Sequence, residues 1–306
     1  MRTPFILDTD IGSDCDDAGA LAMLNGLHAA GVVEMLAVTH CTSNRYGCGC
    51  IDAVNRAYGH RIAVGTLQRA GFLDDEKSMR YNRYITENYP NDYRNTAAPP
   101  AVRVLRQALA SAQDGSVVIA AIGPLPNIRD LLLSPGDDLS PLCGIELTSR
   151  KVGLLSVMGG CASSAEYNFL CDAPAAAFVC EHFPGEIWFS TFEVGADIIT
   201  GLDFGDMADD HPVRVAYRLH SPDGRSSWDQ TAVYIGALGT DPFFRLSPPG
   251  RMRVDKETGR NVFGEDPMGK HRLIHKVMDD NTIAQGIERM MRGDMAGLPA
   301  SAARLG

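Results

Sequence analysis

Short apolar runs alternate with helix-like stretches through the first half of the chain. The apolar runs predict buried strands at 5–7, 33–39, 62–64, 117–122 and 152–157. The stretches between and after them predict helices at 17–30, 50–58, 101–112 and 128–133, and a last helix covers 280–292. Nearly continuous apolar strands separated by helices are typical of a parallel sheet that is covered on both faces. We therefore expect an α/β fold with an open, mostly parallel, Rossmann-like sheet and helices on both faces.

Two segments interrupt this alternation. Residues 67–98 carry aromatic residues among many charges without a clean period, which is typical either of a lid or binding loop or of a partly helical, solvated excursion. Residues 247–269 are rich in proline, glycine and charge, and 256–259 predict a hairpin turn. Because no internal repeat or linker stands out, we expect residues 1–306 to form a single domain with these two segments as a lid and a hairpin insertion.

Composition and charge narrow the class of protein. Of 306 residues, 45% are hydrophobic and 22% are charged, which indicates a globular chain rather than a disordered one. The 38 acidic residues outnumber the 28 basic ones, and the net charge of −10 argues against binding to nucleic acid or to an anionic membrane. The first apolar run is very short and no stretch has the roughly 20 apolar residues of a membrane helix, so we expect a cytoplasmic protein. The eight scattered cysteines are expected to be reduced thiols.

The densest chemical signal follows the first predicted strand. Five carboxylates occur between Asp8 and Asp17, where a buried strand ends and a helix begins. Like charges this close repel one another, and a bound cation removes that cost. Oxygen ligands favour Ca²⁺ or Mg²⁺ over softer metals, and ligands of parallel sheets bind at the carboxyl ends of the strands. A capped helix with a solvated acidic loop is the alternative interpretation.

A strand followed by Asp-x-Asp also opens the phosphatases of the haloacid dehalogenase type. In that interpretation Asp8 is the nucleophile and Asp10 the acid and base of a Mg²⁺-dependent reaction. Residues 205–209 are similar to that family's later acidic motif. This interpretation, however, gives no role to Asp16 and Asp17. In addition, Ile11 stands where that family has a threonine or valine.

The acidic string as a whole, DTDxG followed by DDA and an apolar helix, resembles the signature of the nucleoside hydrolase family of the inosine–uridine-preferring type. The resemblance continues in chain order at four further places, which are AVT with Asn44 (37–44), IGPLPN (122–127), MGG with EYNF and Asp172 (158–172), and WD (228–229). Five motifs in the same order are far more specific than any one of them. The resemblance implies a hydrolase that cleaves the N-glycosidic bond of nucleosides or related N-ribosides and releases ribose and a free base.

The resemblance also implies roles for individual residues. One Ca²⁺ would be bound by Asp10, Asp17, Asp229 and the main-chain carbonyl of Ile122, and Asp10 would act as general base on a water bound to that ion. The side chains that would hydrogen-bond or line the sugar are Asp16, Asn44, Met158, Glu166 and Asn168. The transition state of this reaction resembles an oxocarbenium ion, which nearby carboxylates stabilise. Members of the family are commonly dimers or tetramers, so a homo-oligomer is expected.

Two departures from the family pattern leave alternatives open. Two extra residues separate Gly12 from Asp16 and Asp17, so that Asp14 could take the role given to Asp16. Trp228 stands where these hydrolases carry a histidine that protonates the leaving base. Tryptophan has no useful proton to donate but can stack on a base. Activation of the leaving group must then come from stacking, from the 67–98 segment or from solvent, or else the chain is a nucleoside- or ribosyl-binding protein without turnover.

Overall fold

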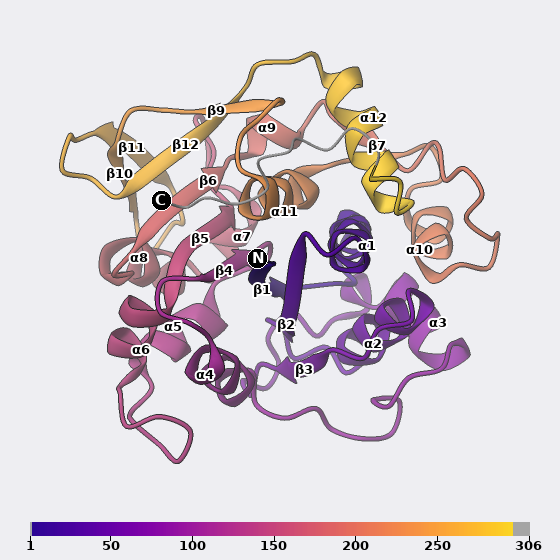
Figure 1. Ribbon diagram of the computed structural model, residues 1–306, viewed down its shortest axis with the longest axis horizontal. Coiled ribbons are helices and arrows are strands. Elements are labelled where there is room, and N and C mark those ends of the chain that lie inside the picture. Colours follow the sequence, from indigo (N-terminus) through magenta and orange to yellow (C-terminus); the bar gives the residue numbers. More distant parts are fainter. Residues whose placement is uncertain (1, 296–306) are drawn as a thin grey trace.

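A ten-stranded sheet runs diagonally through the molecule (Figure 1), and the structure, a computed structural model, describes residues 2–295. Nine strands follow the order β11-β10-β12-β6-β5-β4-β1-β2-β3, and β9 pairs with β12. The parallel strands are β1 (Thr3–Thr9), β2 (Val33–His40), β3 (Ala63–Thr66), β4 (Val117–Ala121), β5 (Val152–Met158), β6 (Glu186–Ser190) and β12 (His271–Lys276). The antiparallel strands at one end are β9 (Phe244–Leu246), β10 (Gly250–Val254) and β11 (Asn261–Glu265).

The five predicted helices begin and end close to the predicted positions. The predicted ones are observed as α1 (Asp16–Ala29), α2 (Gly47–Ala57), α4 (Ala101–Ser111), α5 (Pro126–Leu133) and α12 (Asp280–Met291). The sequence pattern had not assigned α3 (Tyr81–Asn88), α6 (Gly144–Lys151), α7 (Tyr167–Cys171), α8 (Ala173–His182), α9 (Phe192–Gly195), α10 (Pro212–His220), α11 (Trp228–Leu238) and the 3-10 turn η1 (Glu76–Ser78). The expectation of an open, mostly parallel sheet covered on both faces is confirmed.

Two apolar cores cover the two faces of the sheet. Along β1, Phe5 and Leu7 belong to one core and Ile6 to the other, as the alternation of side chains along a strand requires. The first core includes side chains of α1, α11 and α12, and the second includes side chains of α4, α5 and α8. Figure 1 shows these two groups of helices on opposite sides of the sheet. Burial on both faces explains why the central strands are apolar throughout.

The two segments that interrupted the sequence pattern have regular structure. Residues 67–98 contain η1 and α3, and α3 packs against α2 and α10. Strands β10 and β11 form an antiparallel hairpin whose connection runs through 255–260. Whether these segments act as a lid and an insertion in one domain stays a prediction.

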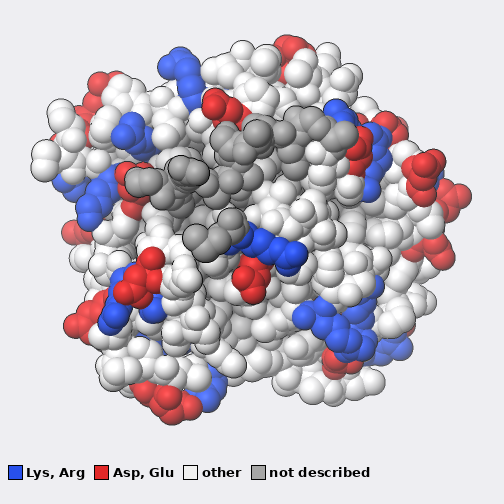
Figure 2. All heavy atoms as spheres, in the orientation of Figure 1, with Lys and Arg blue, Asp and Glu red and all other residues white. Residues whose placement is uncertain are grey.

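Charges on the surface are mixed rather than segregated. On the described part of the face drawn in Figure 2, Lys and Arg lie in small groups among Asp and Glu. This distribution is consistent with the negative net charge and gives that face no continuous basic surface for a polyanion. Within residues 2–295, no helix has both the length and the apolar composition that crossing a membrane requires.

Arg106 of α4 ties that helix to the loop after α5. Its buried guanidinium donates two hydrogen bonds of 2.8 Å to Asp137, and it also binds the carbonyl oxygens of Ser140 and Leu142. Arg106→Met removes these bonds and leaves the buried Ser140 carbonyl without this donor, so it is expected to lower the melting temperature by roughly 5 °C or more. The matched control is Arg103→Met, because Arg103 makes a similar pair with Asp138 in solvent. Thermal unfolding of both variants checks this, and equal shifts would contradict the account.

Candidate active site

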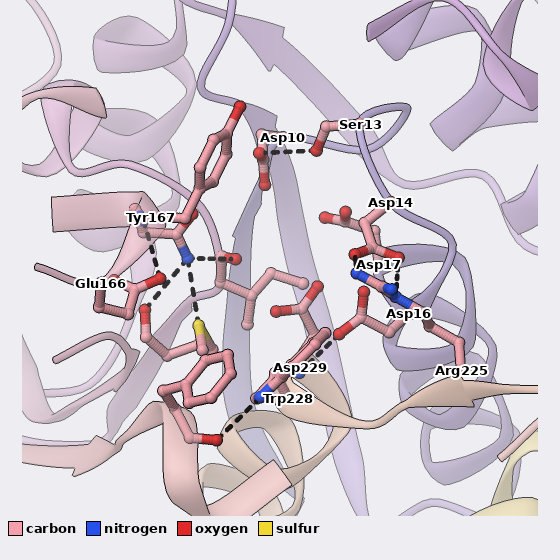
Figure 3. Close-up of a pocket in the computed structure, with 14 residues that line it drawn as sticks. Asp10, Ser13, Asp14, Asp16, Asp17, Glu166, Tyr167, Arg225, Trp228 and Asp229 are labelled. Carbon is pink, nitrogen blue, oxygen red and sulfur yellow. Dashed lines mark hydrogen bonds and ion pairs between the residues drawn. The ribbon is translucent and has the colours of Figure 1, made fainter. Parts of the chain in front are cut away.

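The carboxyl ends of β1, β4 and β5 form the floor of a pocket. Asp10 follows β1, Ile122 follows β4, and Met158 is the last residue of β5. Strands β1 and β4 are neighbours at the point where the strand order reverses, which is where open α/β sheets bind their ligands. The lining residues, drawn in Figure 3, are Asp10, Ser13, Asp14, Asp16, Asp17, Ile122, Met158, Glu166, Tyr167, Asn168, Phe192, Arg225, Trp228 and Asp229.

Three buried carboxylates meet at one wall of this pocket. Asp16 and Asp17 lie in the first turn of α1, and Asp229 lies in the first turn of α11. One oxygen from each of the three lies within 4.8 Å of the others. The backbone N–H of Asp229 donates to Asp16 at 3.2 Å, and the hydroxyl of Thr9 donates to Asp17. Residues more than 200 positions apart in the sequence therefore form one cluster of oxygen donors.

A glycine on α1 allows the two helices to approach closely. A Cβ atom at Gly19 would lie 2.4 Å from both the Gln230 side-chain nitrogen and the Tyr217 hydroxyl oxygen. Because Gln230 follows Asp229 in α11, the absence of a side chain at position 19 brings the N-terminal turns of α1 and α11 together. The partial positive charge at each helix N-terminus also favours the acidic side chains there.

The electrostatics of the cluster favour a bound cation. Burial raises the pKa of Asp16, Asp17 and Asp229 well above the usual value, and the neighbouring carboxylates raise each of them further. A hard divalent cation prefers carboxylate oxygens, and it would offset both the loss of hydration on burial and the repulsion between the carboxylates. The donor set therefore fits such an ion.

Asp10 lies on the pocket wall beside Ser13 (Figure 3). Its carboxylate accepts a hydrogen bond of 3.0 Å from the Ser13 hydroxyl. Burial raises its pKa to about 6. The group of oxygens within 4.8 Å consists of Asp16, Asp17 and Asp229, so the structure brings Asp10 into the same pocket but not into this tightest group.

Asp14 and Asp16 are distinguished by their partners. The carboxylate of Asp14 pairs with the guanidinium of Arg225, with an Nε to Oδ1 distance of 2.7 Å. Asp16 is instead a member of the buried carboxylate cluster. Both side chains line the pocket, and Asp14 is already neutralised by a cation of the chain itself.

The opposite wall presents groups suited to a sugar. Glu166 caps α7 with its side chain, which accepts from the backbone amides of Asn168 and Phe169 at 2.8 and 3.1 Å, and burial raises its pKa to about 7. The Asn168 amide donates to the carbonyl oxygens of Ile122 and Met158 at 3.2 and 3.3 Å. Asn168 thus orients the Ile122 carbonyl, the main-chain ligand of the cation that the family resemblance implies.

Asn44 does not line the pocket in this structure. Its side chain is buried, donates to the carbonyl oxygen of Ser78 at 2.7 Å and accepts from the backbone N–H of Tyr46 at 2.9 Å. It therefore fastens the 67–98 segment to the end of β2. That segment also contacts the acidic loop, because the Tyr81 hydroxyl donates to the Asp14 carbonyl at 2.6 Å. Sugar binding by Asn44 stays a prediction.

Asp8 is badly placed for a nucleophile. It is fully buried, accepts hydrogen bonds from Thr39 and Asn127, and does not line the pocket. Asp206 and Asp209, which had suggested the later phosphatase motif, lie on the exposed surface outside the pocket. The burial of Asp8 therefore argues against the phosphatase interpretation.

An aromatic and cationic rim surrounds the pocket near Trp228. The Trp228 ring stacks on Phe192 with centroids 5.3 Å apart, and its Nε1 donates to the Phe192 carbonyl at 2.9 Å. The Arg225 guanidinium lies 4.8 Å from the Trp228 ring centroid. Neither Phe192 nor Arg225 was predicted from the sequence to belong to the site. Phe192 stands two residues after β6, so its place at a strand end was the available signal, whereas Arg225 lies in the two-stranded sheet of β7 (Ile199–Thr200) and β8 (Arg225–Ser226).

Comparisons with known proteins agree with this geometry. The sequence profile described as inosine-uridine preferring nucleoside hydrolase matches residues 5–218. The chain belongs to this family, and it is an N-glycosidase of the nucleoside hydrolase class. No curated protein matches the chain.

Solved structures share its fold at low sequence identity. The inosine-uridine preferring nucleoside hydrolase of Bacillus anthracis has a TM-score of 0.72 and 17% identity, covering 96% of this chain and 100% of that one. The purine-preferring ribonucleoside hydrolase of Gardnerella vaginalis has a TM-score of 0.70 and 17% identity, covering 95% and 98%. The type III effector XopQ, solved with adenosine diphosphate ribose, has a TM-score of 0.70 and 13% identity, covering 96% and 94%.

Proposed function

We propose that this chain hydrolyses the N-glycosidic bond of ribonucleosides or related N-ribosides, with one Ca²⁺ per chain, and releases ribose and a free base. The observation that carries the proposal is the buried group of Asp16, Asp17 and Asp229 beside Asp10 in a pocket at the switch point of the sheet. Asp10, Asp17, Asp229 and the Ile122 carbonyl would hold the cation. Bound there, Ca²⁺ would supply activation of a water molecule and coordination of sugar hydroxyls.

The residues of the chain have distinct tasks in this proposal. Asp10, which lines the pocket that holds the carboxylate cluster, accepts the proton of the attacking water. Asp16, Glu166 and Asn168 position the sugar hydroxyls, and Met158 packs against the ring. The surrounding carboxylates stabilise the positive charge that develops on the sugar as the bond to the base breaks.

The direct test is release of ribose from a panel of purine and pyrimidine ribonucleosides. We expect turnover that stops in a chelator and returns with Ca²⁺. Because the neighbour XopQ was solved with adenosine diphosphate ribose, that compound belongs in the panel as a binding probe. Tight binding without product after long incubation would support a non-catalytic ribosyl-binding protein, and phosphate release that Asp8→Asn abolishes would support the phosphatase.

Cytoplasmic location and homo-oligomerisation stay predictions.

Trp228→Ala is expected to weaken recognition of the base more than binding of ribose. The indole lies in the rim between Phe192 and Arg225, whereas Glu166 and Asn168, two of the groups proposed to position the sugar, lie on the wall opposite the carboxylate cluster. Loss of one aromatic contact corresponds to a rise in KM of roughly 10-fold for a nucleoside, with little change in the inhibition constant of free ribose. Steady-state kinetics with inosine and uridine, with ribose as inhibitor, check this. An equal loss for ribose and nucleosides would contradict it.

A further inference from the structure

Arg225 is the one cation among the residues that line the described pocket. Its side chain is about two-thirds buried, with 34% of its surface exposed. The Nε and one terminal nitrogen both donate to the Asp14 carboxylate. The plane of the guanidinium is therefore fixed by a two-point ion pair on one side and by the Trp228 ring, 4.8 Å away, on another. Figure 3 shows Arg225 between Asp14 and Trp228 at the edge of the pocket.

This arrangement leaves hydrogen-bond donors free. A guanidinium has five N–H groups, and the two-point pair with Asp14 uses two of them. The other three have no hydrogen-bond acceptor among residues 2–295. Donors that are held in place by the protein and directed at a pocket are prepared for a ligand with acceptor atoms or negative charge.

The reaction creates such a group. As the C1′–N bond breaks, its electron pair stays on the nitrogen of the base, which becomes negatively charged. No histidine is among the residues that line the described pocket, and the indole of Trp228 has no useful proton to give. Arg225 is too basic to act as an acid, but a charged donor can stabilise an anion without giving up a proton.

We propose, resting on the proposed N-riboside hydrolysis, that Arg225 binds the departing base and stabilises the negative charge that forms on it. The water oxygen forms a bond to C1′, Asp10 takes one proton of that water, and the base leaves with the electron pair of the broken bond. The free base then takes a proton from solvent. Asp10 returns its proton to solvent, so the products are ribose and the neutral base, and atoms and charges balance. Arg225 thus performs by electrostatics the activation for which related hydrolases use a histidine.

Substrates with different leaving groups test this proposal. Inosine and uridine have leaving groups that need stabilisation, whereas 4-nitrophenyl β-D-ribofuranoside releases an anion that is stable without help. We expect Arg225→Met to lower kcat for inosine or uridine by at least about 100-fold, but to change kcat for the nitrophenyl riboside by less than about threefold. Arg225→Lys, which keeps the charge but loses the two-point geometry, is expected to restore part of the nucleoside activity.

Asp14→Asn is the matched control. It tests whether Arg225 matters only because its ion pair with Asp14 holds the structure together. It weakens the same ion pair but leaves the guanidinium in the pocket, so we expect a smaller loss with nucleosides than Arg225→Met gives. Losses of equal size on nucleosides and the nitrophenyl riboside, or identical effects of the two substitutions, would overturn the role of Arg225. A wild-type protein that hydrolyses neither kind of riboside would instead overturn the proposed function itself, so the two failures are distinguishable.

Discussion

Replacing Asp10 with asparagine is expected to lower kcat for riboside hydrolysis by about 10⁴-fold. Asparagine has nearly the same shape but accepts no proton, so the attacking water loses its base. Asp10 is suited to this task because its buried side chain lines the pocket that holds the carboxylate cluster. The measurement is kcat for the best nucleoside of the panel at saturating Ca²⁺, with substrate binding followed separately.

Ser13→Ala is the control for this substitution. The Ser13 hydroxyl donates the 3.0 Å hydrogen bond to Asp10 without belonging to the carboxylate cluster. Losing it leaves the base in place, and a loss of about 10-fold or less is expected. An Asp10→Asn protein that turns over at a rate near that of the wild type would reject Asp10 as the base.

Asp229→Asn is expected to abolish stabilisation of the protein by Ca²⁺ and, with it, hydrolysis. In the wild type, Ca²⁺ at 100 times its Kd would raise the free energy of unfolding by about 2.7 kcal/mol. In the variant this gain disappears because one of the clustered carboxylates is missing. The variant is also expected to be at least as stable as the wild type in chelator, because burial and the neighbouring carboxylates penalise an ionised carboxylate at this position and asparagine carries no such penalty. Thermal unfolding with chelator and with Ca²⁺ measures both effects.

Asp206→Asn provides the matched control for Asp229→Asn. Asp206 is exposed and lies outside the pocket, so this variant loses the same charge and should keep the full response to Ca²⁺. An Asp229→Asn protein that responds to Ca²⁺ as the wild type does would show that the ion binds elsewhere.

The sequence predicted the sheet well because both faces of its central strands are buried. A strand such as β4 is apolar at every position, and its ends were placed within one residue. Helix α11 was not predicted, because it is apolar nearly all round and has no polar face to reveal its period. Its first turn could be recognised in the sequence only because Trp228 and Asp229 resemble a late motif of the family.

Site residues that lie directly at the end of a strand could be predicted from the sequence. Site residues that only tertiary contacts bring to the pocket were harder to predict. Asp10, Ile122 and Met158 come directly at the ends of strands, and all three line the pocket. Arg225 belongs to a small separate sheet, and its importance becomes visible only when Asp14 and Trp228 are seen around it. Sugar binding by Asn44 stays a prediction, and the hydrogen bond from its amide to the Ser78 carbonyl is a contact that no spacing in the sequence could reveal.

A crystal structure of the protein grown with Ca²⁺ and ribose tests the central claim most directly. The account predicts one ion bound by Asp10, Asp17, Asp229 and the Ile122 carbonyl, with sugar hydroxyls completing its coordination. Because Asp10 lies apart from the tightest group of carboxylates here, its side chain is expected to turn from Ser13 toward the ion. A pocket without an ion at saturating Ca²⁺, or an ion held by other residues, would contradict the account.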